Sequence, residues 1–188
     1  MFVPSLFFFI IIIVGFLKEE DDDEGLPEPK ANNTIKADGL LEAMVEDTPP
    51  FILDVRTTPE LEENGHIEGA VHIPLAELTQ HLDLLPAFDV PIVVYCGSGW
   101  RATIAMTALG GMGWTDVKAL KALYSECKEA GNPTVDGLPA DPIVLEVAQP
   151  DPSIVAAAEA MLSVYGSKPF GVIDAEGLNT TLAENPDL

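Results

Sequence analysis

The stretch PIVVYCGSGWRATIAMTAL, residues 91–109, contains the strand, loop and helix that decide the fold. Residues 91–95 form an unbroken apolar run rich in β-branched side chains, which predicts a strand buried on both faces of a sheet. Residues 102–109 have the composition of a helix. Cys96 therefore lies at the carboxyl end of a buried strand, on a short loop that leads into a helix. Open α/β sheets place their ligand sites at such strand ends.

The loop that begins at Cys96 is suited to hold a thiolate or a bound anion. A helix start offers unpaired N–H groups and the positive end of the helix dipole. Gly97 and Gly99 allow successive amides to turn inward without a side chain in the way. A thiol held there is expected to ionise more readily than a free thiol, whose pKa is about 8.5. A buried structural cysteine in an ordinary turn is the alternative, and the glycines and Arg101 make it the less favoured one.

Three segments carry a resemblance to a known family. Residues 95–102, YCGSGWRA, resemble the active-site loop of rhodanese-type sulfurtransferases, in which a cysteine accepts sulfur as a persulfide. Residues 51–56, FILDVR, resemble the family's strand that ends in Asp-Val-Arg, and residues 65–74, GHIEGAVHIP, resemble its Gly-His-Ile segment. The motifs occur in the family's order within residues 34–133. The resemblance implies one complete rhodanese-like domain.

The resemblance also implies a reaction. The Cys96 thiolate would take the outer sulfur of a small anionic donor such as thiosulfate and pass it to a thiophilic acceptor such as cyanide or a thiol, in two covalent steps. No cofactor is expected, and no pair of histidine or cysteine residues has the spacing of zinc ligands. The residues expected to bind the substrate around Cys96 are Gly97, Ser98, Gly99, Trp100 and Arg101.

Three further residues are expected to support the site rather than to react. The resemblance implies that Asp54 and Arg56 orient the loop by hydrogen bonds and ion pairing. A structural salt bridge is the preferred interpretation of Arg56, with Glu68 as its expected partner. His66 is a candidate catalytic base, but a lone histidine in a turn is more often a packed or hydrogen-bonded structural residue, and that interpretation is preferred.

Two other functions stay open. A phosphatase or arsenate reductase can share the fold, but the related phosphatases have one more residue between cysteine and arginine, whereas four residues separate Cys96 from Arg101 here. A non-enzymatic sulfur carrier or protein-interaction module would keep the same loop. The chain also departs from the family pattern, since Ala122, Leu123 and Cys127 stand where relatives commonly have a Gly-Gly pair and a tryptophan. These residues imply a narrower pocket, and Cys127 is interpreted as a buried helical residue, with a resolving thiol as the alternative.

The alternation of strands and helices predicts an α/β fold with a parallel sheet flanked by helices on both faces. The resemblance names it the rhodanese-like fold. Beyond residues 91–109, the strands are expected at 34–35, 51–55, 71–73 and 115–120, and the helices at 37–46, 58–64, 75–85 and 123–130.

Composition and charge indicate the character of the remaining segments of the 188-residue chain. A net charge of −22 argues against nucleic-acid binding. Residues 1–17 are apolar and predict an export signal or membrane anchor, with attachment through residues 2–17 and an extracytoplasmic location. Residues 18–31 predict an acidic disordered spacer. The rhodanese-like domain is expected at 32–134, a linker at 135–152, and a helix with the truncated start of a second rhodanese-like repeat at 153–188.

Overall fold

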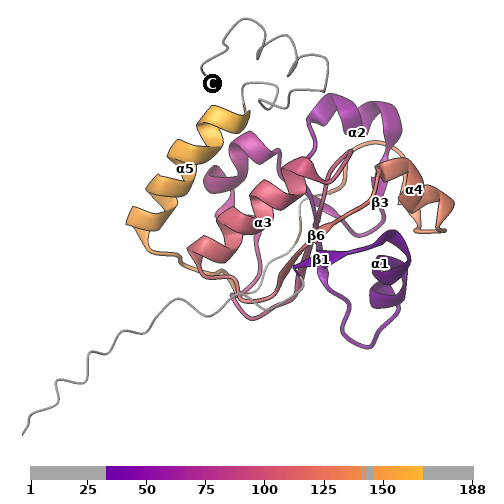
Figure 1. Cartoon of the computed structure of the whole chain (residues 1–188), viewed down its shortest axis with the longest axis horizontal. Helices are drawn as coiled ribbons and strands as arrows, with labels where there is room; N and C mark the ends of the chain where they lie inside the picture. Colours follow the sequence, from indigo (N-terminus) through magenta and orange to yellow (C-terminus); the bar gives the residue numbers. More distant parts are fainter. Residues whose placement is uncertain (1–32, 141, 143–145, 167–188) are drawn as a thin grey trace, which may run out of the picture.

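The protein is described by a computed structural model over residues 33–140, 142 and 146–166 (Figure 1). Its main sheet has five strands in the order β1-β6-β5-β2-β4, and every neighbouring pair is parallel. The predicted parallel sheet is thus confirmed, with residues 34–35 as an edge strand. The strands are β1 (Thr34–Ile35), β2 (Phe51–Asp54), β4 (Val71–His72), β5 (Ile92–Tyr95) and β6 (Val117–Leu120).

The central strand β5 is buried along its whole length because helices cover both faces of the sheet. Its side chains alternate between two cores, as the pleat of a strand requires. Ile92 and Val94 belong to the core that also contains apolar residues of α3 (Trp100–Met112) and α5 (Pro152–Gly166). Val93 and Tyr95 belong to the opposite core, which contains residues of α1 (Ala37–Met44) and α4 (Tyr124–Glu129). Figure 1 shows the two helical layers on opposite sides of the sheet.

A short second sheet lies beside the main one. It pairs β3 (His66–Ile67) with β7 (Thr134–Val135) in antiparallel orientation, so that His66 faces Val135 and Ile67 faces Thr134. The sequence predicts a turn at residue 66 and the start of a linker at residue 135. The pairing instead joins the end of the domain expected at 32–134 to the turn after α2 (Thr58–Asn64).

The prediction of a single helix at residues 75–85 was wrong. The segment forms two 3₁₀-helices, η1 (Leu75–Gln80) and η2 (Leu82–Leu84), separated by His81 with φ −126° and ψ 37°. Leu75 and Leu78 are both buried, and their spacing of three residues matches the three residues per turn of a 3₁₀-helix.

Helix α5 packs against α3 and η1. Ala158 and Leu162 of this helix are buried in the same core as β5 and α3. The sequence predicts that this helix lies beyond the domain expected at 32–134, whereas in the structure the core extends past residue 134 to include it.

Several sequence predictions fall on segments outside the described residues. They are the apolar leader at 1–17, the acidic spacer at 18–31 and, of the helix and repeat start predicted at 153–188, the residues after 166. Within the described ranges, no helix is both long and apolar enough to cross a membrane.

Candidate active site

The cysteine loop leaves the central strand and closes tightly before α3. Cys96 follows β5 directly and has only 1% of its surface exposed. The backbone N–H of Gly99 donates to its Sγ at 3.1 Å. Gly99 has φ +89°, and a Cβ there would lie 3.3 Å from the carbonyl oxygen of Leu120. A glycine is therefore required for the turn that aims this amide at the sulfur.

Arg101, the second residue of α3, is held by Glu60 of α2. Its Nη1 and Nη2 each donate to one carboxylate oxygen of Glu60 at 2.6 Å. Glu60 also accepts from the backbone N–H and the hydroxyl of Thr57, at 2.9 and 2.7 Å. Donation from Arg101 is the main reason that the pKa of Glu60 falls from 4.5 to about 2, and Glu60 in turn raises the pKa of Arg101. The two forked donors expected to face an anion therefore already bind a carboxylate of the protein.

Glu60 is not among the site residues predicted from the sequence. A signal was present, since Thr57 and Glu60 have the three-residue spacing of a capping box at the start of α2. That box fixes the rotamer of Glu60, and the parallel sheet brings α2 close to the start of α3.

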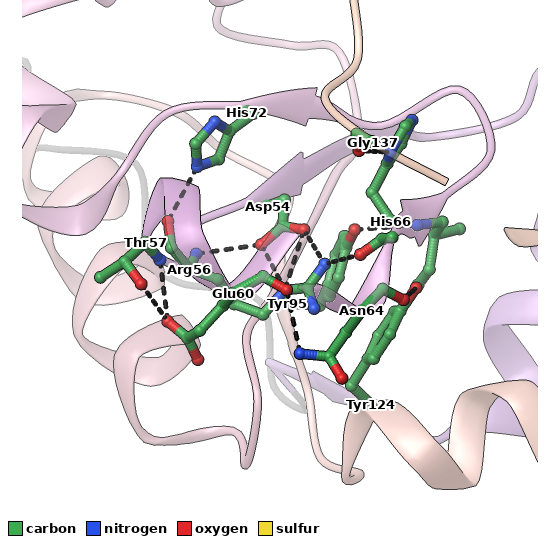
Figure 2. A network of polar contacts seen from close by, with 12 residues as sticks. Asp54, Arg56, Thr57, Glu60, Asn64, His66, His72, Tyr95, Tyr124 and Gly137 are labelled. Atoms are coloured by element: carbon green, nitrogen blue, oxygen red, sulfur yellow. Dashed lines mark hydrogen bonds and ion pairs between the residues drawn. The ribbon is translucent and has the colours of Figure 1, made fainter. Parts of the chain in front are cut away.

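Asp54 and Arg56 form a buried ion pair at the end of β2, which is the centre of the network in Figure 2. Arg56 Nη2 lies 2.6 Å from Asp54 Oδ2 and donates to the Gly65 carbonyl at 2.7 Å. The expectation of Glu68 as the partner of Arg56 was wrong. Residues i and i+2 of an extended chain point to the same side, so Asp54 is the nearer carboxylate. His72 Nε2 lies 2.8 Å from the Arg56 carbonyl oxygen and ties β4 to the same turn.

Two tyrosines enclose the Arg56 guanidinium. Its Cζ lies 4.0 Å from the ring centroid of Tyr124 and 5.4 Å from that of Tyr95. The rings of Tyr95 and Tyr124 are stacked with centroids 6.1 Å apart. Burial raises the pKa of Tyr95, whose hydroxyl accepts the Ile67 N–H at 3.0 Å. The network connects β2, β3, β5 and α4 directly beside the cysteine loop, and neither tyrosine is among the site residues predicted from the sequence.

His66 is buried, and its Nδ1 lies 2.8 Å from the carbonyl oxygen of Gly137 (Figure 2). Its ring therefore faces the segment after β7. This contact agrees with the structural interpretation of His66.

A pocket of about 290 Å³ lies beside the loop, and Gly97 forms part of its wall. The backbone N–H of Tyr124 donates to the Gly97 carbonyl at 3.1 Å, so the start of α4 is joined to the loop. Leu123, at one of the positions where the family commonly has glycine, is half exposed on the pocket wall. The lining residues are Arg56, Glu60, Asn64, Gly97, Leu123, Tyr124, Ser125 and Lys128.

Of the residues expected to bind the substrate, Gly97 lines this pocket, whereas Ser98, Gly99, Trp100 and Arg101 are not among its lining residues. Trp100, the first residue of α3, has 60% of its surface exposed next to the loop. Cys127 is buried in α4, and burial raises the pKa of its thiol to about 11. No cluster of three or more metal-ligating side chains occurs among the described residues.

The sequence between residues 37 and 130 matches the family described as Rhodanese-like domain. The chain belongs to this family. It is 33% identical over 105 residues to the thiosulfate sulfurtransferase PspE of Escherichia coli K12, an alignment that covers 53% of this chain and 96% of PspE. It is 35% identical over 75 residues to the 3-mercaptopyruvate sulfurtransferase of the same strain, but that alignment covers only 33% of this chain and 27% of the relative.

The fold comparison agrees with the family. The solution structure of the rhodanese-like domain of the Alr3790 protein from Anabaena is 25% identical and superposes with a TM-score of 0.50. The superposition covers 63% of this chain and 93% of that domain. The rhodanese-like α/β fold predicted from the sequence is confirmed.

Proposed function

We propose that this rhodanese-family protein is a sulfurtransferase that carries a sulfane sulfur as a persulfide on Cys96. The observation that carries the proposal is the loop itself. Cys96 directly follows the central strand, the Gly99 amide donates to its sulfur, and Arg101 lies close enough to interact with Cys96. Family membership and the named activities of the relatives support the same reaction class.

The first half-reaction is a displacement at sulfur. The Cys96 thiolate attacks the outer sulfur of thiosulfate, a sulfur–sulfur bond forms to Cys96, and the bond to the sulfonate sulfur breaks to release sulfite. An acceptor thiolate or cyanide then attacks the outer sulfur of the persulfide and regenerates the Cys96 thiolate. The Gly99 amide, with the Arg101 cation nearby, would stabilise the negative charge on Cys96 in both steps.

The direct test is the mass of the purified protein after incubation with thiosulfate. One extra sulfur atom, mapped to the peptide that contains Cys96, is the expected result. Cys96→Ser should keep its fold and lose both the adduct and the transfer activity. Cys127→Ser is the matched control and should keep both. Transfer that persists in Cys96→Ser would overturn the proposal.

The phosphatase alternative is tested by comparing thiosulfate with an aryl phosphate on the unmodified protein. With four residues between Cys96 and Arg101, the space enclosed by the backbone N–H groups of the loop is expected to be too small for a phosphoryl group. Sulfur transfer should therefore far exceed phosphate hydrolysis. A phosphate rate equal to or above that of sulfur transfer would favour the phosphatase.

We further propose that residues 2–17 export or anchor the chain, which would give it an extracytoplasmic location. The support is their composition, in which Ser5 is the only polar side chain. Separation of cells that produce the full chain, or a chain that starts at residue 31, into cytoplasmic, membrane and extracytoplasmic fractions tests this proposal. The same distribution of the two chains over all three fractions would contradict it.

A further inference from the structure

The charges around the pocket raise the question of which residue recognises an anionic donor. The chain has only two arginines, Arg56 and Arg101. Arg56 is paired with Asp54, and Arg101 is paired with Glu60. Each arginine therefore meets a carboxylate at close range. Neither pair brings a net positive charge to the pocket.

Lys128 is the third cation at this site and is placed differently. It lines the pocket from the last turn of α4, with its Nζ donating to the Asn64 backbone carbonyl at 2.9 Å. The same Nζ lies 5.0 Å from the ring centroid of Tyr124. Within the described ranges, no carboxylate lies within ion-pair distance of Lys128. Its charge is thus held in position and is not neutralised.

A bound anion would leave the present contacts of Lys128 in place. A lysine ammonium has three N–H donors, and the Asn64 carbonyl uses one of them. The face of the Tyr124 ring attracts the cation without using a further donor in a linear hydrogen bond. Donors therefore stay available to an oxyanion in the pocket, whose wall includes Gly97, the residue that follows Cys96.

We propose that Lys128 recognises the negative charge of the sulfur donor and favours donors of higher charge. This inference rests on the proposed sulfurtransferase function and assigns to Lys128 the anion-binding role that the sequence predicts for Arg101. Lys128 is a binding residue for the donor's oxyanion group, whereas Arg101 serves the Cys96 sulfur and the link to Glu60. The substrate class is a small dianion that has a transferable sulfur.

Two donors that differ by one charge provide the test. Thiosulfate is a dianion and releases sulfite, whereas methanethiosulfonate is a monoanion and releases methanesulfinate. Each transfers its terminal sulfur to the Cys96 thiolate, so the bond that forms and the type of bond that breaks are the same. Because the Coulomb energy doubles with the charge of the donor, Lys128→Gln should lower kcat/KM about twofold for the monoanion and about fourfold for the dianion at low ionic strength.

Two further variants separate charge from structure. Lys128→Arg keeps the charge and should preserve the ratio of the two kcat/KM values. Lys36→Gln removes the same unit charge from an exposed lysine outside this pocket and should change neither value. Added salt should remove the difference between the wild type and Lys128→Gln.

The outcomes distinguish this inference from the function on which it rests. If neither donor forms a persulfide on Cys96 in the unmodified protein, the proposed function fails. If both donors form it but Lys128→Gln lowers the two kcat/KM values equally, or lowers neither, the role of Lys128 is refuted. A larger loss for thiosulfate, with the ratio restored in Lys128→Arg, supports it.

Discussion

Replacing Glu60 by glutamine measures how strongly α2 supports the cysteine loop. The carboxylate accepts four hydrogen bonds, two from Arg101 and two from Thr57. A lowering of its pKa from 4.5 to about 2 corresponds to about 3 kcal/mol as an upper bound. Because 35% of the Glu60 side chain is exposed, solvent screening reduces the expected loss in Glu60→Gln to about 1–2 kcal/mol.

The pH dependence of this loss follows from the direction of the pKa change. A carboxylate whose pKa is lower in the folded state stabilises the fold above its unfolded pKa, and the stabilisation disappears as the pH falls towards the folded pKa. The difference in unfolding free energy between the wild type and Glu60→Gln should therefore be full at pH 7 and shrink between pH 4.5 and about 2. Urea denaturation, monitored by tryptophan fluorescence, measures this difference in unfolding free energy.

Glu62→Gln is the matched control, because Glu62 lies on the same helix and is exposed. It should change the unfolding free energy by less than about 0.5 kcal/mol at every pH. A Glu60→Gln loss that is absent at pH 7, or that stays constant down to pH 2, would refute the role assigned to the link between Glu60 and Arg101.

Three further predictions concern the residues around the loop. Asp54→Asn should destabilise the fold by about 3–5 kcal/mol in chemical denaturation, because it leaves the buried charge of Arg56 without its partner. Gly99→Ala should cost about 1 kcal/mol or more and reduce persulfide formation, since the φ of +89° disfavours a side chain; Gly110→Ala in α3, where an added Cβ meets no atom within 4 Å, should be neutral or stabilising. Iodoacetamide at pH 8 should label Cys127 only after unfolding, because burial raises its pKa to about 11, and peptide mass analysis would detect early labelling that contradicts this.

The main sheet could be predicted because its signals are local. The apolar run before Cys96 and the glycines after it specify a strand, a turn and a helix within one short stretch. The same is true of the strand that ends at Asp54. Each of these elements is buried enough for its composition alone to reveal it.

The contacts that complete the site could not be predicted in the same way. Glu60 and Arg101 lie 41 residues apart in sequence, and nothing in either local pattern names the other as a partner. The pairing of β3 with β7 involves two residues on each strand, too few for an alternating pattern to appear. Tyr124 became part of the site only because α4 folds back onto the turn that carries Arg56.

Because α5 packs on α3 and η1, the folded domain is longer than the region that matches the family. The family match ends at residue 130, yet Ala158 and Leu162 are buried in the same core as the central strand. A polypeptide cut at that boundary would have every recognisable motif and would still present to water the apolar faces of α3 and η1 that α5 covers. Such a surface promotes association between molecules. A segment chosen for expression, or for insertion into another protein, should therefore include residues 152–166, because α5 completes the hydrophobic core.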